Sequence, residues 1–252
     1  MRDALAVEFL KLRKSPVART AGLLIVLLIP AMSFGLVAVV EGSGNGLLAE
    51  KVRALVIGSG WVAYGGLLNQ LAASALFVGV GVVVVWCFGR EFSDRTVGSL
   101  FALPTSRGTI AGAKLIVILG WALLVSVLLV IVATGIGLVG GLGRLDYPAF
   151  EELGTVLSVA SLTSLLASTL SLPASIGRGY LPAIGAMVLI LMTAQFAVLF
   201  EAGAWYPYAS PGLWAVSGQG DLVNAAHLAT VPVLAGVGAL LTVRWWQRFE
   251  LV

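Results

Sequence analysis

Six long apolar runs dominate the sequence and limit the folds that it can adopt. Each run holds about the 20 residues that an α-helix needs to cross the ~30 Å hydrocarbon core of a bilayer. None shows the period-two alternation that is typical of membrane β-strands. The runs are Thr20–Val40, Leu67–Phe88, Leu115–Val139, Leu153–Leu172, Tyr180–Phe200 and Leu222–Val243. We therefore predict an all-α integral membrane protein with six transmembrane helices.

The composition indicates one membrane domain, residues 1–252, rather than soluble domains. Hydrophobic residues make up 59% of the chain and charged residues only 11%, whereas soluble domains carry about 25% charged residues. The net charge of +3 does not indicate nucleic-acid binding, because the cations flank the apolar runs. A single cysteine, Cys87, excludes an internal disulfide. The lipid bilayer is thus the first predicted partner.

Lysine and arginine are distributed unevenly between the two ends of the predicted spans. One end holds twelve of the 15, namely Arg2, Lys11, Arg13, Lys14, Arg19, Arg90, Arg95, Arg107, Lys114, Arg178, Arg244 and Arg248. The opposite loops hold Lys51, Arg53 and Arg144. Because cytoplasmic loops carry the excess of basic residues, we expect both termini in the cytoplasm.

Two flanking segments have distinctive patterns. Residues 1–19 mix apolar and basic side chains, which fits either an amphipathic helix on the inner leaflet that Pro16 ends, or plain flanking charge. Residues 201–214 combine Trp205, Tyr208 and Trp214 with two prolines. That pattern fits an outer re-entrant hairpin before the sixth span, and an ordinary interfacial aromatic belt would also explain it.

The loop 89–114, between the second and third predicted spans, is rich in charged and polar residues. Glu91 and Arg95 are spaced i,i+4, the favourable order on a helix. We therefore predict a short amphipathic helix at the cytoplasmic side of the membrane, which Pro104 would end. Its apolar side would carry Phe92, Thr96, Leu100 and Leu103, and its charged rim Arg90, Glu91, Asp94 and Arg95. We expect this helix to dock on a partner protein, and the alternative is a solvated connector.

Few polar side chains lie inside the predicted spans. Serines recur at steps of three or four along the fourth run, so they share one helix face. They are Ser158, Ser161, Ser164, Ser168 and Ser171, and isolated amides occur at Asn69, Gln70 and Gln195. Small hydroxyl residues favour close helix packing, and a polar lining of a substrate path is the other interpretation.

Several kinds of chemistry are missing from the chain. The closest approach to a P-loop, Gly108–Leu115, has the wrong glycine spacing, so the chain does not match a nucleotide-binding motif of this kind. The one histidine, His227, fits a satisfied or interfacial side chain better than a metal ligand. The predicted spans lack the converging acids, histidines or metal ligands that an intramembrane catalyst needs. We expect no enzyme activity, no metal site and no cofactor on this chain.

The loop residues Glu91, Arg95, Thr96, Leu103, Pro104, Arg107 and Lys114 resemble the loop after the second span in permease subunits of ABC-2-type exporters. The six spans, the basic N-terminal segment and the outer hairpin resemble that family as well. The resemblance implies a dimer with a second permease copy or paralogue. It also implies two copies of a separate cytoplasmic ATPase, which would hold ATP and Mg²⁺ and receive 89–114 as a coupling helix.

The resemblance further implies a bacterial or archaeal plasma membrane and export of a drug, a peptide antibiotic or a lipid-like molecule. Fold alone does not choose among substrates. Two other classes remain open from the sequence, an intramembrane enzyme and a non-transporting scaffold or immunity protein. An ATPase encoded beside this gene would favour the exporter.

Overall fold

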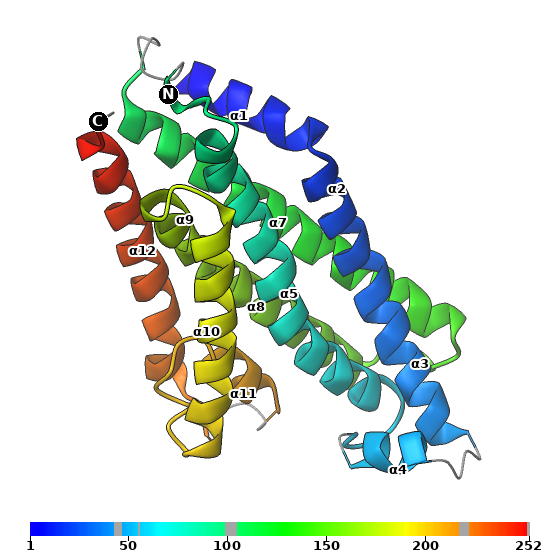
Figure 1. Ribbon diagram of the computed structural model, residues 1–252. Coiled ribbons are helices and arrows are strands. Elements are labelled where there is room, and N and C mark those ends of the chain that lie inside the picture. Colours follow the sequence, from blue (N-terminus) through cyan, green and yellow to red (C-terminus); the bar gives the residue numbers. More distant parts are fainter. Residues whose placement is uncertain (43–46, 55, 99–104, 217–221, 251–252) are drawn as a thin grey trace.

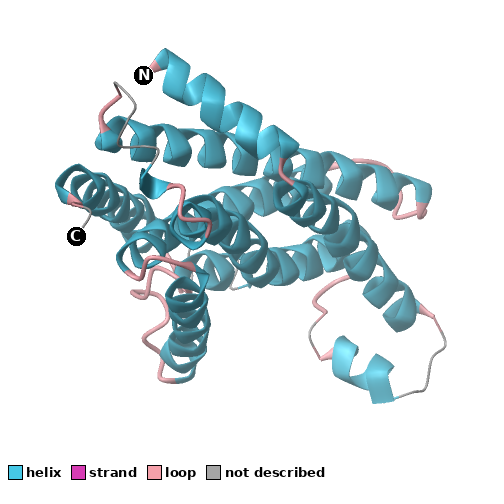
Figure 2. Cartoon of the chain, turned by 45° about the horizontal axis from the view of Figure 1, so that its top comes forward, coloured by secondary structure: helices cyan, strands magenta, loops and turns pink. Residues whose placement is uncertain are grey.

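The computed structural model describes residues 1–42, 47–54, 56–98, 105–216 and 222–250. Within these ranges the regular elements are helices and no strand occurs (Figure 2). Six helical stretches are long and apolar enough to cross a membrane, which confirms the predicted architecture. They are Pro16–Glu41, Gly60–Ser93, Arg107–Val139, Tyr147–Ile176, Tyr180–Leu199 and Ala225–Arg248.

The first span follows an N-terminal helix and consists of three consecutive pieces. The elements are α1 (Arg2–Lys14), α2 (Pro16–Leu23), the π-helical turn η1 (Leu24–Leu28) and α3 (Ile29–Glu41). The Ser15 hydroxyl accepts a hydrogen bond from the Ala18 N–H, so α2 begins with a capped first turn at Pro16. The wider turn η1 directly precedes Pro30, whose missing N–H removes a helical hydrogen bond.

The second and third spans are α5 (Gly60–Ser93) and α7 (Arg107–Val139), and the short α4 (Leu47–Arg53) precedes α5. The prediction that a separate helix begins near Glu91 was wrong, because α5 runs on without a break through that residue. Arg95 lies in a turn with a left-handed φ of 54°. Glu91 and Arg95 are therefore not i,i+4 neighbours on one helix. Helical backbone resumes at Val97, and Leu100 and Leu103 lie outside the described residues.

The remaining elements complete the bundle. They are α8 (Tyr147–Ala167), the 3₁₀ turn η2 (Ser168–Leu170), α9 (Ser171–Ile176), α10 (Tyr180–Leu199), α11 (Ser210–Val216) and α12 (Ala225–Arg248). The sixth span begins at Ala225, three residues later than predicted, because Asn224 caps it. The Asn224 side chain accepts backbone N–H groups of the first turn, and His227 Nδ1 accepts the Asn224 N–H. This capping box confirms that the His227 side chain is satisfied.

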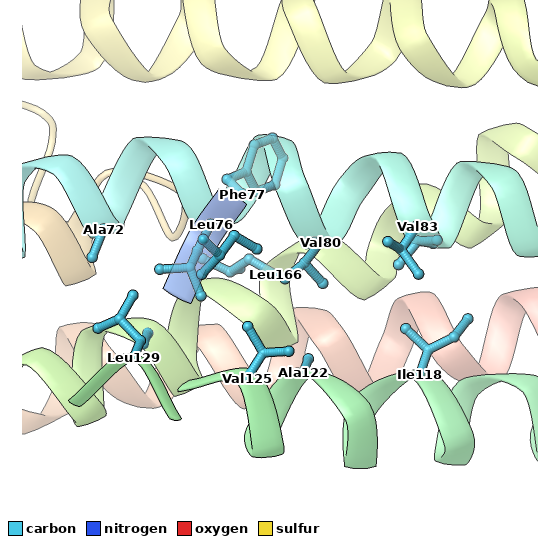
Figure 3. Packing of buried hydrophobic residues seen from close by; sticks show 14 of the residues in the cluster. Ala72, Leu76, Phe77, Val80, Val83, Ile118, Ala122, Val125, Leu129 and Leu166 are labelled. Carbon is cyan, nitrogen blue, oxygen red and sulfur yellow. The ribbon is translucent and has the colours of Figure 1, made fainter. Parts of the chain in front are cut away.

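Helix α5 lies at the centre of the bundle and packs against α7, α8 and the first span (Figure 1). Its residues Val80 and Val83 are fully buried and lie opposite Ala122 and Ile118 of α7, with Leu166 of α8 close to Val80 (Figure 3). The alanine at 122 keeps the two backbones close. Helix α5 is therefore the element against which most other helices of the bundle pack.

Large apolar side chains also cover the outside of the bundle. On α10 and α12, Leu181, Leu189, Phe196, Val233 and Leu240 are each more than half exposed. Exposing such an apolar surface to water is unfavourable, whereas lipid tails solvate it. The exposed face therefore agrees with a multi-pass membrane protein.

Both termini lie at one end of the bundle, together with the last turn of α5 and the first turn of α7 (Figure 1). Helices α4 and α11 lie at the opposite end (Figure 1). The basic residues of the N-terminal helix and of the 94–107 segment thus share one end, which is the arrangement that the charge asymmetry predicted.

Candidate functional site

Four charged side chains form an ion-pair network where α1 meets the ends of α5 and α7. The Lys114 ammonium donates to Glu8 Oε2 and to Glu91 Oε1, each at 2.8 Å. Lys11 Nζ lies 2.8 Å from Glu8 Oε1 and 3.4 Å from Glu91 Oε1. Thr96 Oγ1 donates to the other Glu91 oxygen at 2.7 Å. Two acids and two bases therefore neutralise each other between three helices.

The network is buried. The Lys114 and Glu91 side chains are 2% and 3% exposed, and that of Glu8 is 8% exposed. Charges removed from water are tolerated when they are paired and hydrogen-bonded, as these are. Removing one partner from such a cluster leaves an uncompensated charge and costs about 3–5 kcal/mol. The network thus holds α1 firmly against the bundle.

An aromatic cluster fastens α12 to the same end of α5. The Phe92 ring lies 5.9 Å from Trp245, 5.8 Å from Trp246 and 5.8 Å from Phe249, measured between ring centroids. Trp246 is almost fully buried, and its Nε1–H donates to Ser175 Oγ at 2.9 Å. Edge-to-face contacts of this kind add stability beyond the area that they bury.

The start of α7 also contacts α12. Arg107 donates a hydrogen bond to the Phe249 carbonyl. A Cβ on Gly108 would lie 2.6 Å from Gln247 Cγ, so glycine permits this close approach. The last turn of α5 and the first turns of α7 are therefore anchored by α1 through ion pairs and by α12 through aromatic and polar contacts.

The residues predicted to contact a partner divide into two groups. Asp94, Arg95 and Thr96 are exposed at the surface of this end. Glu91 is buried in the ion-pair network, so the expectation that it belongs to a solvated charged rim was wrong. Phe92 packs within the chain against α12, and the Arg90 guanidinium lies 4.6 Å from the Trp86 ring centroid. The partner-binding role of this segment stays a prediction.

A cavity of about 510 Å³ opens between α5, α8, α10 and the segment around α11. Gln70 and Gln195 line it, as do Ser74, Thr163 and Tyr208, among apolar neighbours such as Phe77. No Asp, Glu, Lys, Arg or His is among its lining residues. Nor do the described residues contain a group of three metal-binding side chains. The volume and the few polar groups are typical of a site for an uncharged organic molecule.

The segment before α11 covers one side of this cavity. Tyr208 OH pairs with Thr169 Oγ1 at 2.8 Å, and its ring lies 5.6 Å from that of Phe77. Burial raises the pKa of the Tyr208 hydroxyl above its usual value, and the bond to Thr169 acts in the opposite direction. Tyr206 OH pairs with Thr193 Oγ1 at 2.7 Å. These bonds tie the predicted outer hairpin to η2 and α10, while its re-entrant character stays a prediction.

The serines predicted to form a stripe on α8 do not line the cavity. Ser158 is exposed, Ser161 is half-buried, and Ser164 and Ser168 are buried. Three of the hydroxyls donate to carbonyls of their own helix, while Ser164 Oγ has no partner. The 3₁₀ turn at Ser168 interrupts the regular helical spacing that the prediction assumed. This geometry agrees with close packing, and a role in transport stays untested.

Glu8 and Lys114 are the residues of this region that sequence reasoning did not single out as a pair. A signal was present, since Glu8 lies three residues after Leu5 and four before Leu12, on the inward face of α1. An acid at such a position among basic neighbours indicates a buried partner. Nothing in the sequence identifies Lys114, which is 106 residues away, as that partner.

Comparisons with known proteins give two matches. The model of a family described as "ABC-2 family transporter protein" matches residues 4–195. The chain is also similar to the "Bacitracin transport permease protein BCRB" of Bacillus licheniformis. The two are 23% identical over 146 residues, which cover 56% of this chain and 69% of the relative. The match to the family includes most of α1, the ion-pair network and most of the cavity-lining residues.

Proposed function

Because the chain belongs to the ABC-2 family of transporter proteins, we propose that it is the transmembrane subunit of an ATP-driven exporter. The chain is a multi-pass membrane protein, and two copies, or this chain and a paralogue, form the transport path. A separate cytoplasmic ATPase, present twice, binds ATP and Mg²⁺ and drives the cycle. A division of transport and ATP hydrolysis between separate subunits agrees with the absence of a P-loop motif from this sequence.

The end that carries the termini faces the cytoplasm in this proposal. Twelve of the 15 lysines and arginines lie in segments at that end, and basic residues flank spans on the cytoplasmic side. Helices α4 and α11 then lie at the outer side. The ATPase would accordingly meet the exposed turn at Asp94–Thr96.

The observation that carries the proposed coupling role is the anchoring of the two helix ends that flank residues 94–106. Glu91 precedes this segment and Lys114 follows it, and both bind the same acid–base network with Glu8 of α1. A movement of the ATPase that displaces the exposed turn would therefore move α1, α5 and α7 together. In this proposal the ATPase contacts the exposed Asp94, Arg95 and Thr96, together with Leu100 and Leu103. Glu91 and Phe92 transmit the displacement to α1 and α12.

The cavity supports an uncharged, largely apolar substrate. The amide and hydroxyl groups of the cavity would form hydrogen bonds with polar groups of a ligand. No charged side chain lines the cavity to pair with a charged ligand. A drug, a peptide antibiotic or a lipid-like molecule fits this description. Since the cavity measures about 510 Å³, a large peptide would enter it with only part of its structure.

Co-purification with the ATPase encoded beside this gene tests the proposal. We expect Arg95→Ala combined with Leu100→Ala to abolish recovery of the ATPase while the permease stays at its normal level in the membrane. Arg144→Ala is the matched control, because Arg144 is an exposed arginine at the opposite end. Full recovery with the double variant, or micromolar ATP binding by the isolated permease, would contradict the proposal.

A further inference from the structure

A carboxyl group lies between α5 and α8, far from the ion-pair network. Glu152 is five residues beyond the start of α8 and is half-buried. A Cβ on Gly65 of α5 would lie 2.5 Å from Glu152 Cβ and 2.7 Å from its Oε2. The missing side chain at Gly65 therefore provides the space in which this carboxyl lies directly against the α5 backbone.

The carboxyl has one polar side chain beside it. Asn69, one turn after Gly65, is fully buried, and its Nδ2 lies 3.4 Å from Glu152 Oε2, which is long for a hydrogen bond. Its amide oxygen Oδ1 is buried and has no partner. No lysine, arginine or histidine of the described chain lies within ion-pair distance of Glu152. An acid and an orphaned acceptor thus share one buried contact.

The ionisable groups around this contact offer no counter-charge. Glu151, the neighbour on α8, is exposed and adds negative charge. On α5, the Tyr64 hydroxyl is within hydrogen-bonding distance of the Pro30 and Ala133 carbonyls instead. The cations of α5, α7 and α12 lie at the other end of the bundle, α11 has no ionisable side chain, and His227 is engaged by Asn224. Asp146 caps the first turn of α8.

We propose that Glu152 and Asn69 form a proton-binding site between α5 and α8. With the proton on Oε1, the acid donates to Asn69 Oδ1 while Asn69 Nδ2 donates to Oε2, so both groups are satisfied by a reciprocal pair. The ionised acid only accepts, which leaves the buried Asn69 Oδ1 without a donor. The proton comes from water at the end that carries α4 and α11, and no other bond changes.

The site is connected to the cavity through the chain itself. Asn69 faces Glu152, and the next residue, Gln70, lines the cavity. Uptake of the proton tightens the contact between α5 and α8, and its loss loosens the wall that these helices share with the cavity. This inference does not depend on which substrate is exported.

Infrared spectroscopy of the full chain in lipid nanodiscs tests the site, since a protonated carboxyl has a carbonyl band that a carboxylate lacks. An ordinary exposed glutamate, with a pKa of about 4.3, gives no such band at neutral pH. We expect the band in the wild type at neutral pH, its loss in Glu152→Gln and its persistence in Glu151→Gln. Asn69→Leu should shift the band, because the acid then loses its amide partner.

A second measurement separates this role from folding. Glu152→Gln has the shape of the neutral acid, so it should keep the thermal stability of the wild type at neutral pH and no longer lose stability as the pH rises. The proposal is overturned if the band is unchanged in Glu152→Gln, or if no protonated carboxyl is present at neutral pH. A band that disappears when Na⁺ or K⁺ is added at constant pH would also overturn it, in favour of a metal cation.

Discussion

Lys114 of α7 donates to Glu8 of α1 at 2.8 Å, although 106 residues separate them in the chain. The same ammonium donates to Glu91 at the end of α5. One buried cation thereby joins the N-terminal helix to both helices that flank residues 94–106. This contact makes α1 part of the bundle rather than an element that only lies on the membrane surface.

Replacing Lys114 by methionine should destabilise the protein by about 3–5 kcal/mol, because Glu8 and Glu91 then share a buried site with only Lys11 to compensate them. Thermal unfolding in detergent measures the effect, with Lys14→Met, an exposed lysine of α1, as the control. Adding Glu8→Gln and Glu91→Gln to Lys114→Met should restore part of the loss. A single variant as stable as the wild type would show that the network does not hold α1 in place.

Phe92→Ala should lower the free energy of unfolding by about 1–3 kcal/mol, less than the ~3–5 kcal/mol of a fully buried phenylalanine, because Phe92 is half-buried against α12. Phe9→Ala on α1, where the ring is 58% exposed, is the control. Unchanged stability together with lost ATPase binding would instead identify Phe92 as a direct anchor of the partner.

Ser164→Leu should destabilise the chain by about 1–3 kcal/mol, because it adds bulk where α8 is buried. Ser158→Leu should be tolerated, since Ser158 is exposed and leucine suits a lipid-facing position. Thermal stability of the two purified variants decides the matter. Equal behaviour of both would contradict the packing interpretation of the serines.

Single cysteines introduced at Asp146 and Arg248, in a Cys87→Ala background, test the orientation. A membrane-impermeant thiol reagent added to intact cells should label position 146 and spare position 248, because the proposed topology places the basic end in the cytoplasm. Labelling after permeabilisation confirms that position 248 is accessible. The reverse pattern in intact cells would invert the proposed topology.

Gln70→Leu and Gln195→Leu should each reduce export of an uncharged substrate by about 2- to 10-fold, the equivalent of one hydrogen bond of ~0.5–1.5 kcal/mol. Stability should stay unchanged, since neither side chain is fully buried. Met192→Leu, an exposed residue of α10 outside the cavity, is the control for export. Undiminished export by both glutamine variants would place the substrate path elsewhere.

The sequence by itself determined the membrane architecture. An apolar run indicates that lipid surrounds a helix, and its length indicates the thickness that the helix crosses. All six spans were therefore predicted, although α5, α7 and α8 begin six to eight residues before the predicted runs. Pro16 marked the break between α1 and α2 in the same local way. The motif around Glu91 and Lys114 indicated the family that the comparisons then identified.

Only the tertiary structure decided which polar residues meet. A pattern within one helix shows that Glu8 or Phe92 is on an inward face, but a buried charge or ring is satisfied by residues of another helix. The ion pairs of Lys114 with Glu8 and Glu91, the packing of Phe92 on Trp246 and the contact of Glu152 with Asn69 all join distant segments. Helix packing sets them, because it alone brings those segments within hydrogen-bonding or van der Waals distance.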